Sequence, residues 1–312
     1  MKKVLLTSGD SWTFGSEIAA PELLASPGEI GYGLSNRFKK DRSCFEPAND
    51  YYRIPRTWSS YLAQNMNAES VNISWPSRSN DSIYNSIMGW VMREYIIPKK
   101  DTSDLTIVVG WSSPERKDAI VEDEQGFISY FTIWPNLGKS EFYPGIVEKK
   151  LAEFHVKHMW IEFEYISRFV GQAHNLWMFC QLYDIKLRMF NSFYVPRSLD
   201  SKPTRFEEWS DTSFTRLLDS WTQIANTRIR PICDGVHQAK EEVQRVRDTW
   251  SSIPEDVFLL KDEKSNTFKS FIEENIVKEN RWTGIHPSPE SHKTWAEFLY
   301  KYVKCIYIWS YI

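Results

Sequence analysis

"KVLLTSGDSWTFG" (residues 3–15) joins a short apolar run directly to a glycine, an aspartate and a serine. The apolar run, residues 3–8, is typical of a strand that is buried on both faces of a parallel sheet. Two interpretations of the polar residues are open. Either Asp10 or Ser11 caps a helix in an ordinary strand-to-helix turn, or Ser11 is held at the carboxyl edge of a sheet, where a substrate can reach it.

Other apolar runs extend this pattern along the chain. Three of them are predicted to be strands of the same sheet: residues 69–74, 104–111 and 185–193. Segments 56–66 and 80–96 lie between the first three runs and carry apolar residues at helical spacing. Alternating strands and helices predict a three-layer α/β/α fold with a central parallel sheet. Because polar, turn-forming residues follow each of the first three runs, we expect three loops to meet at the ligand-binding edge of that sheet.

The remainder of the chain is predicted to be mainly helical. Helices are expected at residues 146–183 (one long helix or a helix pair), 236–252 and 291–308. The sequence contains no repeat, low-complexity tract or clear interdomain linker. We therefore expect a single α/β domain over the whole chain, residues 1–312, with large helical insertions or a cap at 118–184 and 195–280.

The composition of the 312-residue chain is that of a soluble globular protein, with 42% hydrophobic and 25% charged residues. A net charge of −3 gives no clear signal for nucleic-acid binding, which requires a clustered basic excess. The first residues lack the long apolar stretch of a signal peptide, and no run approaches the roughly 18 apolar residues of a membrane span. We therefore expect a cytoplasmic protein without a membrane partner. Its 14 Trp, 15 Tyr and 18 Phe residues favour a bulky core over an aromatic-lined cleft.

Cysteine and histidine spacing predicts neither a disulfide framework nor a metal site. The four cysteines are far apart and none has CxxC spacing: Cys44, Cys180, Cys233 and Cys305. His155 and His158 stand three residues apart, but no acidic or cysteine partner lies at ligand spacing. We interpret them as solvated or packed side chains, and we expect no cofactor.

One histidine stands in a more constrained place, in "TGIHPSPESHKTWAEFL" (residues 283–299). His286 precedes a proline, which restricts its backbone, and a helix follows shortly after. Another candidate is His237 in "CDGVH" (residues 233–237), with Asp234 three residues before it. That histidine has no proline after it and opens a charged helix of the kind found on solvated surfaces, so His286 is preferred.

Together, the Gly-Asp-Ser block and the late histidine block resemble the SGNH, or GDSL-type, hydrolase family. Ser11 and His286 match the family's nucleophile and base in residue type, order and context. "WPSRSND" (residues 75–81) is similar to the second family block, and "VGWSSPER" (residues 109–116) to the third. The match is confined to four pieces of the chain. Overall, the sequence resembles phage-encoded members of the family most.

The resemblance implies an SGNH/flavodoxin-like fold and acyl transfer through an acyl-serine intermediate. Ser11 would be the nucleophile and His286 the general base that takes its proton. The backbone N–H groups of Ser11 and Ser77 would face the oxyanion, with Ser112 at the third donor position.

Three departures from the family pattern stand at these positions. Ser77 replaces the glycine of the second block, Ser112 replaces the asparagine of the third, and Thr283 replaces the aspartate three residues before the histidine. Without that aspartate, the imidazole needs another orienting acid. Glu279, or an acid from the insertion, could supply it.

The remaining motif residues are predicted to support the loops. Asp10 would cap the helix or brace its loop, whereas Asn80 and Arg116 would fix the other two loops. The leading hypothesis is an esterase or deacetylase acting on a small-molecule or carbohydrate-linked ester. An acyltransferase using the same serine, and a catalytically degenerate scaffold kept for binding or assembly, are the alternatives.

Overall fold

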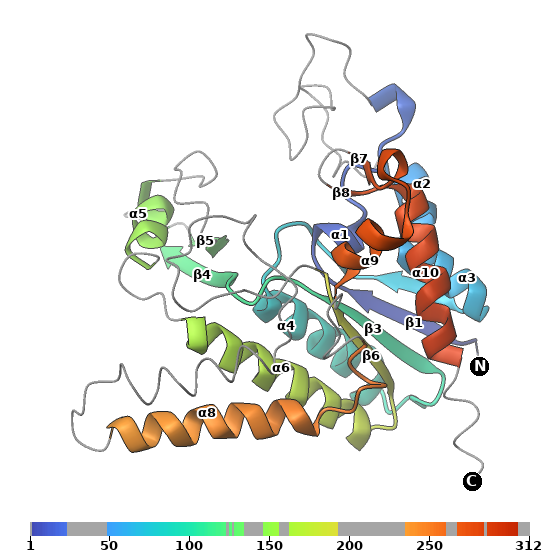
Figure 1. Cartoon of the computed structure of the whole chain (residues 1–312). Coiled ribbons are helices and arrows are strands. Elements are labelled where there is room, and N and C mark those ends of the chain that lie inside the picture. Colours follow the sequence, from blue (N-terminus) through green and yellow to red (C-terminus); the bar gives the residue numbers. More distant parts are fainter. Residues whose placement is uncertain are drawn as a thin grey trace.

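The computed structural model describes residues 2–23, 49–122, 125–126, 128–133, 146–155, 162–192, 235–259, 267–283 and 286–304. A four-stranded parallel sheet forms its centre (Figure 1). In spatial order, its strands are β2 (Glu69–Asn72), β1 (Val4–Ser8), β3 (Leu105–Trp111) and β6 (Lys186–Asn191). The predicted α/β fold with a central parallel sheet is therefore confirmed.

The strand order 2-1-3-6 creates a switch point between β1 and β3, because the chain leaves β1 toward β2 and then returns past β1 to β3. Both faces of these strands are apolar. Leu5 and Val108 belong to the core on one face, and Leu6 and Ile107 to the core on the other. This two-sided burial explains why the strands read as continuous apolar runs.

Helices cover both faces of the sheet (Figure 1). One face packs against α3 (Trp58–Met66), α9 (Phe268–Asn275) and α10 (Pro289–Lys304). The other packs against α4 (Asn80–Val91) and α6 (Glu162–Leu182), and α8 (Gly235–Ser252) lies against α6. The short elements are α1 (Ser11–Phe14), η1 (Pro21–Leu23), α2 (Asp50–Arg53), η3 (Ile54–Arg56), the π-helical turn η4 (Met92–Ile96), η9 (Lys278–Asn280), β7 (Trp282–Thr283) and β8 (His286–Pro287).

The segment expected to be a helical insertion at 118–184 needs a correction at its start. An antiparallel ribbon of β4 (Lys117–Glu122) and β5 (Ile128–Ile133) comes first, and the helix pair α5 (Ile146–Phe154) and α6 follows. Alternating side chains form one apolar face of the ribbon, where Val121, Phe131 and Ile133 pack against α5. Because α6 packs directly on the sheet, much of this segment belongs to the central layers.

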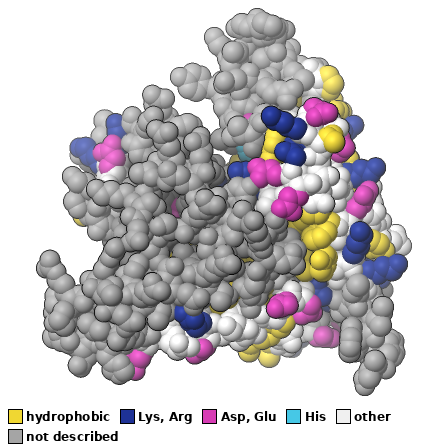
Figure 2. Space-filling model, viewed as in Figure 1, with side chains coloured by type: hydrophobic (Ala, Val, Ile, Leu, Met, Phe, Trp, Pro, Cys, Tyr) yellow, Lys and Arg dark blue, Asp and Glu magenta, His cyan; other side chains and the backbone are white. Residues whose placement is uncertain are grey.

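The described surface shows no large field of one charge on the visible face. Figure 2 shows Lys/Arg and Asp/Glu side chains interspersed there. Within the described ranges, no helix has both the length and the apolar character needed to cross a membrane. Cys180 is buried on α6, and burial raises the pKa of its thiol to about 12. Cys44, Cys233 and Cys305 lie outside the described residues.

Candidate active site

The loop after β1 places Ser11 at the carboxyl edge of the sheet, as the first residue of α1. Asp10 is the N-cap of that helix, and its Oδ1 accepts a hydrogen bond from the backbone N–H of Trp12 at 3.0 Å. A Cβ on Gly9 would lie 2.8 Å from the carbonyl oxygen of Gly110 on β3, so the loop after β1 can approach β3 this closely only with glycine. The Ser11 side chain does not act as the cap, because its hydroxyl makes no hydrogen bond within the described part of the chain.

Asp10 also ties the first loop to the loop after β3. Its Oδ2 accepts hydrogen bonds from the Ser112 hydroxyl at 2.9 Å and from Nη1 of Arg116 at 3.1 Å. All three side chains are buried. Burial raises the pKa of Asp10, and the nearby Arg116 guanidinium opposes that shift. The Asp10–Arg116 contact is therefore a buried ion pair that holds the two loops together.

Asn80, the first residue of α4, holds the same loop through its backbone. Its Oδ1 accepts from the N–H of Ser112 at 2.8 Å, and its Nδ2 donates to the carbonyl oxygen of Ser112 at 3.1 Å. Both hydrogen-bond donors of Ser112 are thus used inside the protein. In this structure the hydroxyl of Ser112 therefore holds Asp10, and the role of Ser112 as an oxyanion donor stays a prediction.

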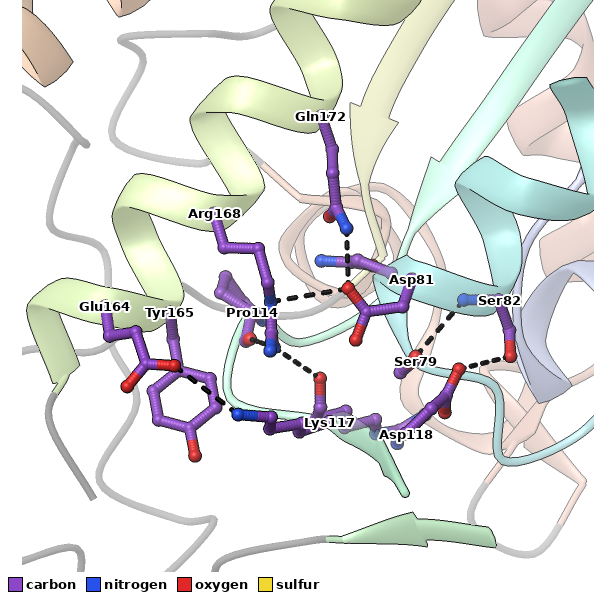
Figure 3. A network of polar contacts seen from close by, with 12 residues as sticks. Ser79, Asp81, Ser82, Pro114, Lys117, Asp118, Glu164, Tyr165, Arg168 and Gln172 are labelled. Atoms are coloured by element: carbon purple, nitrogen blue, oxygen red, sulfur yellow. Dashed lines mark hydrogen bonds and ion pairs between the residues drawn. The ribbon is translucent and has the colours of Figure 1, made fainter. Parts of the chain in front are cut away.

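A polar network behind the β3 loop fixes it further (Figure 3). Nη2 of Arg168, on α6, lies within hydrogen-bond reach of the carbonyl oxygens of Pro114 and Arg116. Nε of the same arginine is 3.4 Å from Oδ1 of Asp81 on α4, which also accepts a hydrogen bond from Gln172 at 2.6 Å. The loop that carries Arg116 is therefore anchored to two helices.

The loop after β2 carries Ser77 beside this site. Ser77 has a φ of 65°, in the left-handed region where glycine is favoured, which agrees with the glycine expected from the resemblance. The N–H of Trp75, two residues earlier, donates to the carbonyl oxygen of Gly9 at 3.3 Å. Among the described residues, the backbone N–H of Ser77 makes no hydrogen bond.

His286 reaches the site from the other end of the chain. It lies on β8, which packs against α1, and its side chain is buried. Burial raises the pKa of Asp10, and His286 is near enough to that carboxyl to oppose the rise slightly. Nδ1 of His286 is 3.3 Å from Oε1 of Glu17, and the backbone N–H of His286 donates to Oε2 of Glu17 at 3.3 Å. The structure thus places Ser11, Glu17 and His286 on adjoining elements at one edge of the sheet.

No motif in the sequence marks Glu17 as a site residue. The orienting acid suggested from the sequence, Glu279, lies on η9 and is solvent-exposed. Thr283, at the family's aspartate position, is paired directly opposite His286 in the β7–β8 ribbon. Only its position shortly after the Gly-Asp-Ser block could have singled out Glu17, because no local pattern links it to a residue 269 positions away.

The other histidines have structural surroundings. Nδ1 of His292 accepts a hydrogen bond from the N–H of Trp58 at 3.2 Å, and burial lowers the pKa of His292 to about 3. His155 contacts the hydroxyl of Tyr165. His158 and Asp234 lie outside the described residues, as does the side chain of His237, whose backbone is in α8. No group of three His, Cys, Asp or Glu side chains with metal-binding geometry occurs in the described segments.

The sequence model of one protein family matches residues 38–212, more than half of the chain. The chain belongs to a family of unknown function (DUF6071). The DUF6071 match includes Asn80, Ser112 and Arg116, but it begins after Ser11 and ends before His286. No curated protein matches the chain.

Solved structures similar to this DUF6071 member include a putative lipolytic protein of the G-D-S-L family from Desulfitobacterium hafniense DCB-2. It has 11% identity and a TM-score of 0.39, over 96% of this chain and 99% of that one. A family two carbohydrate esterase from Clostridium thermocellum, in complex with cellohexaose, has 14% identity and a TM-score of 0.40, over 99% of this chain and 66% of that one. The acetyl xylan esterase Est2A from Butyrivibrio proteoclasticus has 12% identity and a TM-score of 0.38, over 98% and 65%.

Proposed function

We propose that this protein is an SGNH-like serine hydrolase that cleaves an ester through an acyl-serine intermediate. The observation that carries the proposal is the position of His286. It lies on β8, which packs against α1, and its Nδ1 is 3.3 Å from Oε1 of the buried Glu17. A neutral histidine whose Nδ1–H is directed at an acceptor keeps the lone pair on Nε2, which can then act as a base.

In the proposed reaction, Oγ of Ser11 attacks the ester carbonyl while Nε2 of His286 takes the hydroxyl proton. The tetrahedral intermediate collapses, its C–O bond to the alcohol breaks, and the imidazolium protonates the departing alcohol. Water then attacks the carbonyl of the acyl-serine while Nε2 of His286 takes a proton from it. The bond between the acyl carbon and Oγ of Ser11 breaks, Nε2 returns the proton to Oγ, and the acid is released. The backbone N–H groups of Ser11 and Ser77 face the oxyanion. The N–H of Ser11 has no acceptor within its own helix, because it belongs to the first turn of α1.

The reacting atoms are available for a substrate. In the described part of the protein, neither the hydroxyl of Ser11 nor Nε2 of His286 makes a hydrogen bond. Catalytic hydrogen bonds are often long before substrate binds and shorten in the Michaelis complex. The serine–histidine bond would form at that stage.

An exposed tryptophan supports a carbohydrate-linked ester as the substrate. Trp75 is 53% exposed, and its ring packs edge-on against Phe14 with centroids 5.5 Å apart. Phe14 is one turn after Ser11 on α1, so both side chains lie on the same side of that short helix. The guanidinium of Arg53 stacks 3.6 Å from the centre of the Phe14 ring and fixes it. The indole therefore presents a braced, amphipathic surface near the nucleophile, suited to the apolar C–H face of a sugar ring.

One observation favours a second function, a scaffold that binds esters or other ligands without turning them over. Both donors of Ser112 are engaged, so two backbone N–H groups remain for the oxyanion where the family pattern has a third donor. Removal of one such donor typically slows an enzyme by about two to three orders of magnitude. Slow turnover is therefore expected unless the substrate supplies a compensating contact.

A fluorophosphonate probe tests the activated serine directly. Wild-type protein should be labelled and Ser11→Ala should not, whereas Ser16→Ala, a matched loss of a buried hydroxyl in the same loop, should be labelled like wild type. Hydrolysis of p-nitrophenyl acetate should fall about a thousandfold or more in Ser11→Ala. Absence of labelling in wild type, or equal labelling of Ser11→Ala, would leave the binding scaffold as the better description.

The substrate class is tested with two acetyl esters. Trp75→Ala should raise KM about tenfold for acetylated xylo-oligosaccharide, the equivalent of about 1.4 kcal/mol, and leave hydrolysis of p-nitrophenyl acetate unchanged. Tyr302→Ala removes an exposed aromatic ring from the last turn of α10 and should affect neither. Equal losses on both esters would contradict a sugar-binding role for Trp75.

A further inference from the structure

We propose that Glu17 is the orienting acid of His286, in a role that the family pattern gives to the residue at position 283. The proposal rests on the proposed hydrolase function, because orientation of the imidazole matters for catalysis only if His286 is the base. It makes Glu17 a positioning residue that acts through the histidine. The acid would then come from the loop of the nucleophile, while the family's aspartate position holds Thr283.

Both oxygens of the Glu17 carboxylate face the same residue. Oε2 accepts the backbone N–H of His286, and Oε1 lies 3.3 Å from Nδ1 of its ring. The backbone contact sets the position of the carboxylate independently of the ring. Oε1 and Nδ1 lie within ion-pair distance but make no hydrogen bond with each other in this structure. Catalytic hydrogen bonds often tighten only when substrate binds, and a carboxylate that closes on Nδ1 favours the tautomer with its proton on that nitrogen.

Burial argues that this carboxylate has a specific role. The side chain of Glu17 is fully buried, and a buried carboxylate costs several kcal/mol unless it is paired and hydrogen-bonded. A protein that needed only a surface loop at this point would place the charge in water. The contacts with His286 are part of what stabilises a glutamate inside the protein.

The backbone conformation of Glu17 also supports a specific role for this residue. Its φ is 66°, in the left-handed region that glycine or asparagine adopts more readily than glutamate. Such conformations persist where surrounding contacts hold them, and they cluster at functional sites. Here the following turn is held by Asn49, which donates to the carbonyl oxygen of Ile18 and accepts from the N–H of Ala20. The carboxylate that contacts His286 is thus carried by a residue in a strained backbone conformation.

Glu17→Gln separates orientation from packing. The amide can still accept the backbone N–H of His286, so the loop should remain folded, but it presents either a neutral oxygen or an N–H to Nδ1. An N–H there would favour the tautomer whose Nε2 carries the proton and cannot act as a base. We expect kcat for p-nitrophenyl acetate to fall about 10²- to 10⁴-fold, the upper value being that seen for the corresponding change in serine proteases. KM should change much less.

Relocation of the acid is the sharper test. Thr283 is directly opposite His286 in the antiparallel β7–β8 pair, where facing Cβ atoms are typically about 5 Å apart. In the Glu17→Gln background, Thr283→Asp should recover at least tenfold of the lost kcat, and the matched Thr283→Asn should recover none. A purely structural role for Glu17 predicts no rescue by either variant, and that result would overturn the proposal.

A readout without turnover keeps this proposal distinct from the proposed function. Proton NMR should show a downfield imidazole N–H resonance that is lost in both Glu17→Gln and His286→Gln, whether or not the protein hydrolyses esters. If Ser11→Ala retains full hydrolysis, the proposed function is wrong. If Ser11→Ala is inactive but Glu17→Gln keeps kcat within threefold and retains the resonance, only the assignment of Glu17 is wrong.

Discussion

The loops that follow β1 and β3 lie side by side at one edge of the sheet, but they are built for different purposes. In the loop after β3, Ser112 uses both of its donors inside the protein, and Arg116 forms a buried ion pair with Asp10. In the loop after β1, the Ser11 hydroxyl makes no hydrogen bond within the described chain, and Glu17 has a strained backbone. One loop supplies rigidity, whereas the other holds a serine hydroxyl that makes no hydrogen bond in the described chain.

The largest expected effect is the loss of stability caused by a change in the loop after β3. Arg116→Met removes the guanidinium and leaves the buried Asp10 carboxylate without its charge partner, which should lower the free energy of unfolding by about 3–5 kcal/mol. Ser11→Ala removes a hydroxyl that makes no hydrogen bond in the described chain, so its effect should stay within about 1 kcal/mol. Urea unfolding followed by tryptophan fluorescence measures both values.

A double variant provides the control for that prediction. Asp10→Asn in the Arg116→Met background neutralises the stranded charge and should recover part of the lost stability. If Arg116→Met costs no more than Ser11→Ala, the two loops do not differ in the way the contacts indicate.

The second effect concerns pH and the same rigid loop. Burial raises the pKa of Glu115 to about 7, from 4.5. The native protein therefore keeps a proton on Glu115 between about pH 4.5 and 7 that the unfolded chain releases, and this contribution to stability is lost as the pH rises through that window. Glu115→Gln stays neutral, so relative to wild type it should gain up to roughly 3 kcal/mol between pH 4.5 and pH 8.

Comparison with the variant at each pH removes the opposing contribution of His292. The pKa of that buried histidine is lowered to about 3, so its contribution to stability is lost as the pH falls from about 6.5 toward 3. Parallel pH profiles for wild type and Glu115→Gln would show that Glu115 is not held protonated in the native loop.

Much of this edge could be predicted from the sequence, because it is local. The apolar runs specify the parallel strands, and the Gly-Asp-Ser block specifies the turn in which Gly9 allows close approach and Asp10 caps α1. The β4–β5 ribbon was not predicted, because Ala119, Ile120 and Val121 are consecutive apolar residues and show no strict alternation. Glu17 could not be predicted, since its role depends on a left-handed backbone and on a contact across 269 residues.

The smallest expected effect is that of Ser112→Ala, which tests the role of Ser112 between the two loops. Ser112→Ala removes the hydrogen bond to the Asp10 carboxylate and keeps the backbone N–H that Asn80 accepts, so it should cost about 2 kcal/mol of stability. Hydrolysis of p-nitrophenyl acetate should fall by less than tenfold, because the hydroxyl does not face the oxyanion. A loss of 10²- to 10³-fold, as expected for an oxyanion donor, with stability unchanged would show instead that this hydroxyl turns toward the substrate. The loop after β3 would then contribute directly to catalysis, and the two loops would not have separate structural and catalytic roles.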